Sequence, residues 1–86
     1  MARTAREPDL VLRAALGDRV RRARLRAGLS QEQLSFAADL SMRHVGNIER
    51  GLTNPSAEEL TRLAHALNRQ PGTLLPRIDP DGRPVR

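Results

Sequence analysis

Two side chains near the middle of the chain, Arg43 and Asn47, can each form a pair of parallel hydrogen bonds with a flat partner. They are four residues apart, which places them on one face of a helix. If Val45 and Ile48 point inwards, Met42, Arg43 and Asn47 face outwards. Arginine recognises O6 and N7 of guanine, asparagine pairs with adenine, and an apolar side chain packs against the methyl group of thymine. We therefore expect Met42, Arg43 and Asn47 to contact DNA bases.

These side chains need a short helix that its neighbours hold in place. Ser41 is a suitable N-cap and Gly51 a suitable stop, so the helix should run from Met42 to Arg50. Before it, Ser30 and Gln33 have the form of a capping box and predict a helix over residues 31–38. Two short helices joined by about four residues allow the second to enter the major groove while the first lies across the backbone.

The remaining chain also has a helical pattern. An apolar stripe predicts a helix over residues 9–27, and a second capping box predicts one over residues 57–68. Pro71 can open one last helical turn. No strand pattern is found, and the segment from Arg77 is too polar and too rich in proline to pack. We therefore expect a flexible tail over 1–8, one domain over 9–76 and a second flexible tail over 77–86.

Composition narrows the possible functions. With 86 residues the chain holds one small domain, and its lack of cysteine excludes disulfides and thiolate chemistry. Fifteen arginines give a formal charge of +5, which favours a polyanionic partner such as double-stranded DNA. No apolar run could cross a membrane, so we expect a cytoplasmic protein with no membrane partner. The two histidines are isolated, without the partners that a metal site or a catalytic triad needs. We therefore expect no metal, no cofactor and no catalytic residue, and a protein that is not an enzyme.

The spacing of these motifs resembles the Cro and phage-repressor type helix-turn-helix domain, the XRE family, over about residues 11–75. The resemblance implies an all-α, compact five-helix lambda-repressor-like domain. It also implies a sequence-specific transcriptional regulator, with repression the expected direction, that binds an inverted-repeat operator as a homodimer. The matching residues are Leu29–Leu34, Leu40, Ser41, Val45, Ile48–Gly51, Asn54–Ser56, Leu60, Leu63, Ala64 and Leu67.

The resemblance also suggests roles for single residues. Helix geometry turns positions 42, 43, 46, 47 and 50 outwards, and the base-reading positions of the family fall on three of these, Met42, Arg43 and Asn47. Phosphate contacts are expected from Gln31, Ser41, His44 and Arg50. A structural ion pair is expected between Arg24 and Glu49. The apolar side chains left over for a dimer interface are Leu74, Leu75 and Ile78, together with Leu10 and Val11.

Several alternatives stay open at this point. Gly46 either lets the recognition helix approach the groove floor or is merely tolerated on an exposed face. Phe36, the only aromatic residue, marks a partner surface or folds onto its own helix. The competing function is an antitoxin that holds a protein toxin and regulates its own operon, and a third is a factor that bridges to other proteins such as the transcription machinery.

Overall fold

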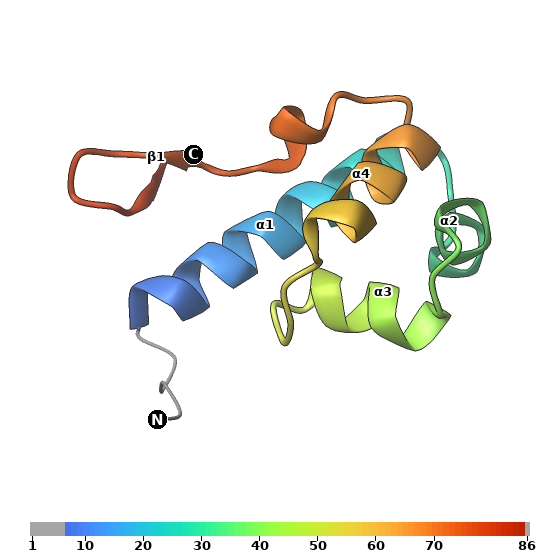
Figure 1. Cartoon of the computed structure of the whole chain (residues 1–86), viewed down its shortest axis with the longest axis horizontal. Helices are drawn as coiled ribbons and strands as arrows, with labels where there is room; N and C mark the ends of the chain where they lie inside the picture. Colours follow the sequence, from blue (N-terminus) through green and yellow to red (C-terminus); the bar gives the residue numbers. More distant parts are fainter. Residues whose placement is uncertain (1–6, 86) are drawn as a thin grey trace.

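The structure of the chain is a computed structural model, which describes residues 7–85; most of the expected N-terminal tail lies outside these residues. Figure 1 shows α1 (Glu7–Arg26) as a long helix on which α3 (Met42–Glu49) packs, and α2 (Gln31–Ala38) packs in turn against α3 and α4 (Ala57–Ala66). The turn η1 (Pro71–Leu74) follows α4. Two short strands, β1 (Arg77–Ile78) and β2 (Pro84–Val85), end the described chain.

The helix boundaries largely confirm the predicted caps. The Ser30 hydroxyl accepts a hydrogen bond from the Gln33 amide at 3.0 Å, and the Gln33 side chain accepts one from the Ser30 amide at 2.8 Å. Ser56 and Glu59 repeat this capping box at the start of α4. Between α2 and α3, Asp39 takes the left-handed conformation, with φ of 55°. Aspartate tolerates this conformation better than most residues, so the turn is formed without glycine. The first helix begins at Glu7, two residues before the expected start.

The expectation of five helices needs one correction. Four segments are α-helices, but the last one, Pro71–Leu74, is a 3-10 turn. Pro76 disfavours helical backbone at Leu75, which leaves four residues between the two prolines. The short run closes with hydrogen bonds from Thr73 to Gln70 and from Leu75 to Gly72, three residues apart in each case.

The prediction that the chain contains no strand, with an unpacked end from Arg77, was wrong. Arg77 pairs with Val85 and Ile78 with Pro84 in an antiparallel hairpin. Its turn is closed by the Asp79 carboxylate, which accepts hydrogen bonds from the amides of Asp81 and Arg83 at 3.0 and 2.8 Å. The hairpin lies along the N-terminal half of α1 (Figure 1), where Pro84 and Val85 line a pocket with Val11 and Ala14. Local turn chemistry therefore forms a hairpin that the strand pattern is too short to reveal.

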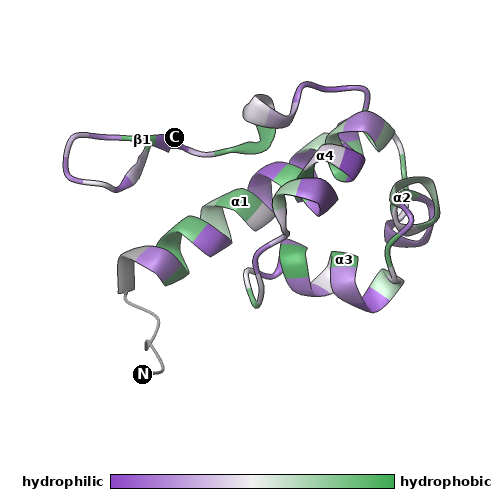
Figure 2. Ribbon diagram, in the orientation of Figure 1, coloured by the Kyte–Doolittle hydropathy of each residue, from purple (hydrophilic) through white to green (hydrophobic). Residues whose placement is uncertain are grey.

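The core lies between α1, α2, α3, α4 and η1. Figure 2 shows that apolar and polar residues alternate around the helices, so each helix buries one stripe. The residues that the helical periodicity predicts to be buried in the four helices are found in this core, except for Leu12 and Leu60, which are only half-buried. The buried apolar residues are Leu16, Val20, Ala23, Leu34, Ala38, Val45, Ile48, Leu63, Ala64, Leu67 and Leu74.

A glycine sets the distance between α1 and α3. A Cβ atom on Gly17 would overlap the backbone carbonyl oxygen of Ile48 and lie 2.7 Å from that of Glu49. These oxygens are backbone atoms at the end of α3, so they cannot rotate away as a side chain would. The absence of a side chain at Gly17 therefore lets the two helices pack closely, and this packing orients α3.

Candidate nucleic-acid interface

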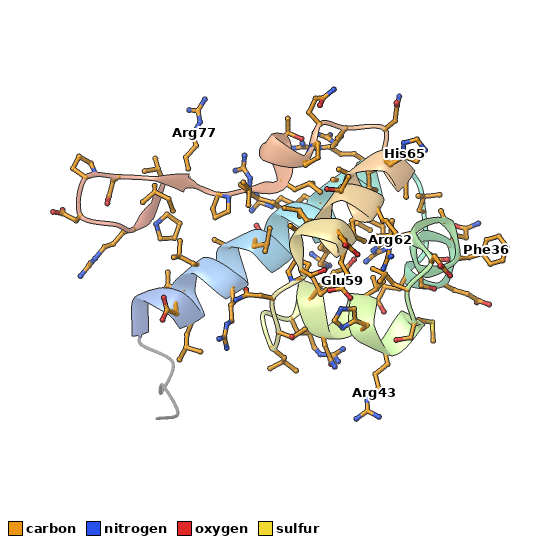
Figure 3. The ribbon with its side chains drawn as sticks, viewed as in Figure 1. Phe36, Arg43, Glu59, Arg62, His65 and Arg77 are labelled. Atoms are coloured by element: carbon orange, nitrogen blue, oxygen red, sulfur yellow. The ribbon has the colours of Figure 1, made fainter. Side chains whose placement is uncertain are left out.

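The two faces of α3 separate as the sequence predicts. Val45 and Ile48 are 0% and 1% exposed, whereas Met42 on the other face is 54% exposed. Figure 3 shows Arg43 extending from α3 away from the rest of the protein. Asn47 is half-buried one turn further along the same face. The structure thus places Met42, Arg43 and Asn47 together on one outward surface.

Arg50 lies across this surface rather than extending from it. Its Nη2 atom donates a hydrogen bond to Oδ1 of Asn47 at 2.7 Å. A Cβ atom on Gly46 would lie 3.2 Å from Nη1 of Arg50, so the guanidinium occupies the space that a side chain at Gly46 would take. This contact gives Gly46 a role beyond the two considered from the sequence: it makes room for Arg50 beside Asn47.

The expected ion pair between α1 and α3 is present and is nearly inaccessible to solvent. Arg24 donates from Nε and Nη2 to the two carboxylate oxygens of Glu49, at 2.7 and 3.0 Å. Its third nitrogen donates to the backbone carbonyl of Leu29 at 2.9 Å, which ties down the chain between α1 and α2. Both charged residues are 8% exposed. The hydrogen bonds to Glu49 raise the pKa of Arg24 above its ordinary value, so the guanidinium stays protonated.

Gln31 belongs to the same network, which the sequence did not predict. Its Nε2 atom donates to Oε1 of Glu49 at 3.0 Å. A single carboxylate therefore connects the end of α1, the start of α2 and the end of α3. The predicted phosphate contact of Gln31 would have to use its backbone amide or the second N–H of Nε2, because the first N–H is bonded to Glu49 and Oε1 can only accept. Ser41 caps α3 by accepting from the His44 amide at 3.0 Å, and its exposed hydroxyl is still able to donate.

His44 faces α4 as well as the outer surface. Its Nε2 atom lies 3.0 Å from Oε2 of Glu59, in a close contact that lacks hydrogen-bond alignment. Figure 3 shows Glu59 on the side of α4 that faces α3. The Ser56 backbone amide, followed by His44, lowers the pKa of Glu59 below its ordinary value. His44 thus links the starts of α3 and α4 in addition to its predicted phosphate contact.

The residues expected at a dimer interface divide into two groups. Leu74 is 1% exposed and belongs to the core, so its assignment to the interface is corrected: η1 turns it inwards beneath α4. Leu75 and Ile78 are 49% and 50% exposed. They line a hollow of about 470 Å³ whose other walls include Leu12, Leu16 and Pro76. Leu10 and Val11, near the start of α1, are also exposed.

Phe36 does not fold onto its own helix, which corrects the interpretation favoured from the sequence. The side chain is 89% exposed and points away from α2 (Figure 3). It borders a shallow apolar hollow with Leu40 and Ser35. The partner-surface interpretation of Phe36 therefore stays open.

Three features were not predicted from the sequence. They are the close helix contact at Gly17, the hydrogen bond of Gln31 to Glu49, and the hydrogen bond of Arg50 to Asn47. A glycine inside a strongly helical pattern was the available indication for Gly17, because such a residue lowers helix propensity without an obvious local reason. Over residues 7–85, no helix combines the length and apolar character of a membrane span. Over the same residues, no cluster of three or more histidine or acidic side chains is arranged to hold a metal ion.

Comparisons with known proteins agree on the architecture. A helix-turn-helix family model matches residues 20–74. The control protein C.BamHI of Bacillus amyloliquefaciens is 38% identical over 65 residues, which is 74% of this chain and 80% of that protein. The crystal structure of the restriction-modification controller protein C.AhdI from Aeromonas hydrophila superimposes with a TM-score of 0.72 and 40% identity, covering 73% of this chain and 96% of that one. The DNA-binding domain of the P22 C2 repressor superimposes with a TM-score of 0.67 and 30% sequence identity, covering 69% of this chain and 78% of that one.

Proposed function

The chain belongs to the helix-turn-helix family of DNA-binding regulators, and we propose that it binds an inverted-repeat operator as a homodimer and represses transcription there. The observation that carries this proposal is the outward face of α3. Arg43 and Met42 are exposed on it, Asn47 lies beside them, and the buried network around Glu49 fixes the helix from behind.

Each outward residue has a defined role in the proposal. Arg43 reads a guanine through O6 and N7, Asn47 reads an adenine, and Met42 contacts a thymine methyl group. The backbone is gripped by Gln31 and Ser41 at the starts of α2 and α3, where free amides favour a phosphate. His44 and Arg50 add positive or hydrogen-bonding groups beside them.

The relatives support a proposal about which genes are regulated. The proteins C.BamHI and C.AhdI carry the names of controller proteins, and C.AhdI controls a restriction-modification system by its title. This chain spans 96% of the C.AhdI chain at 40% identity. We therefore infer a controller of restriction-modification genes, and the relatives favour a regulator over the antitoxin considered from the sequence.

The first test is selection of bound sequences from a randomised duplex pool with the purified protein at near-physiological salt. The proposal expects one inverted repeat with half-sites one helical turn apart, about 34 to 36 Å. The Arg43→Ala variant should lose one conserved guanine in each half-site, at a cost of about 1 to 3 kcal/mol in binding. Binding that shows no sequence preference and fades uniformly with salt would contradict the proposal.

The dimer is tested separately through the exposed apolar surface of Leu75 and Ile78. Sedimentation at tens of micromolar should show a dimer for the parent chain. The Leu75→Asp variant should shift it to monomer because a carboxylate would be buried in an apolar interface. Val85→Asp on the neighbouring strand, with 43% exposure in the parent residue, tests how far the interface extends. A parent chain that is monomeric with and without its operator would exclude the dimer.

A further inference from the structure

Four arginine side chains meet in a pocket on the side of α1 that the operator surface does not use. Arg19, Arg22 and Arg26 come from α1, and Arg69 comes from the segment after α4. The pocket measures about 250 Å³, and its remaining walls are Ala23, Thr73 and Leu74. We call it the arginine pocket.

The position of the arginine pocket follows from helix geometry. Gly17 and Arg24 mark the side of α1 that packs on α3, because Gly17 lies against its backbone and Arg24 bonds to Glu49. At 3.6 residues per turn, Arg19, Arg22 and Arg26 fall on the opposite side of the same helix. Figure 1 agrees, since η1 and α3 lie on opposite sides of α1. A duplex held by α3 therefore does not reach this pocket.

The charges in the arginine pocket are not balanced from within. None of its lining residues is acidic. Asp18 pairs with Arg22 at 2.9 Å from outside the pocket, which leaves Arg19, Arg26 and Arg69. The Nε atom of Arg19 is buried and has no hydrogen-bond partner. Like charges gathered in one place and a buried donor without an acceptor both cost free energy that a bound anion would remove.

We propose that the arginine pocket binds a compact diphosphate group, free or as part of a small phosphorylated molecule. One phosphoryl group carries about −1.5 to −2 charges at neutral pH, so two of them match the three uncompensated guanidinium groups. The planar donors of arginine suit phosphate oxygens bidentately. A pocket of this volume accepts a small ligand but not a nucleic-acid duplex. The inference does not depend on operator binding.

The test is calorimetric titration of the full chain, without DNA, with sodium pyrophosphate at constant ionic strength. Arg19→Gln and Arg69→Gln are each expected to weaken binding at least tenfold. Arg83→Gln makes the same change of charge on the exposed hairpin and should leave the affinity within a factor of two. Circular dichroism checks that each variant is folded. If Arg19→Gln is unfolded, Arg26→Gln replaces it, because Arg26 lies at an exposed position of the same pocket.

Amide chemical shifts locate the bound ion. Pyrophosphate should perturb Gly72 and Thr73 at the pocket, whereas shifts confined to Gln31 and Met42 would place the ion at the helix starts of the operator surface and overturn the proposal. Equal weakening by Arg83→Gln, or orthophosphate binding as tightly as pyrophosphate, would also overturn it. A nucleoside diphosphate that binds as well as pyrophosphate would support a nucleotide source, and one that does not would support the inorganic ion.

Discussion

The two faces of α3 are built from the same eight residues but obey different requirements. On the inner face, Val45, Ile48 and Glu49 are each less than a tenth exposed, and Glu49 is bonded from two other helices. On the outer face, Met42 and Arg43 are exposed. Inner substitutions should therefore change the stability of the fold, and outer ones should change DNA binding while leaving stability almost unaltered.

The largest effect is expected from Glu49→Met. The variant leaves the Arg24 guanidinium buried without its partner and removes the acceptor of Gln31, so unfolding should become easier by about 3 to 5 kcal/mol. Chemical denaturation measures this change. The double variant Arg24→Met, Glu49→Met should recover much of the loss because no buried charge remains unpaired. A single variant as stable as the parent chain would show that the pair is solvated rather than buried.

Gly17→Ala should have the next largest effect on stability. The added methyl group meets two backbone carbonyl oxygens at the end of α3, so α1 and α3 must separate. Overpacking of this kind typically costs about 1 to 3 kcal/mol. Gly72→Ala is the matched control, because nothing lies within 4 Å of a Cβ atom there. If both alanine variants had equal melting temperatures, the close helix contact would not be required.

Gly46→Ala should separate the two faces most sharply. The atoms nearest to a Cβ atom there belong to the guanidinium of Arg50, a flexible end that can move, and alanine favours a helix by about 1 kcal/mol over glycine. Stability should therefore be unchanged or slightly higher. The displaced Arg50 no longer holds the Asn47 amide, so base preference at the position read by Asn47 should relax about threefold, as measured by binding to operator variants.

Arg50→Lys provides the comparison for Gly46→Ala. Lysine keeps the positive charge but has no planar fork, so it should reproduce the relaxed base preference while retaining most of the backbone attraction. If both variants kept the operator affinity and the base preference of the parent chain, Gly46 would have no role in recognition.

The smallest expected effect is on the acid dependence of stability. The pKa of Glu59 is lowered in the folded protein by the Ser56 amide and His44, so its contribution is present above the ordinary carboxyl pKa and is lost as the pH falls through the lower folded value. Glu59→Gln keeps the capping box but has no charge to lose. Its melting temperature should therefore fall less than that of the parent chain between pH 5 and pH 3, roughly the range of carboxyl titration.

Glu58→Gln is the control for this measurement, since Glu58 is exposed on the same helical turn. Equal acid sensitivity in the Glu59 and Glu58 variants would mean that the contacts of Glu59 do not contribute.

Local rules were enough for much of the molecule. The capping boxes at Ser30 and Ser56 depend on neighbouring residues only, and both were predicted. The outward placement of Arg43 was also predictable, because the apolar period of α3 fixes which face is buried. The hairpin after Arg77 was missed because a two-residue strand has no period and its turn depends on one aspartate.

The sequence by itself determined the ends of the four α-helices to within two residues, which stripe of each is buried, and which residues α3 turns outwards, because these properties arise from contacts within a few residues. Only the tertiary structure decided that Gly17 sets the contact of α1 with α3, that Gln31 joins Arg24 on one carboxylate, that Leu74 is core, and that four arginines surround one pocket. These features depend on the distances between segments far apart in the chain, which helix packing fixes and a local pattern does not contain.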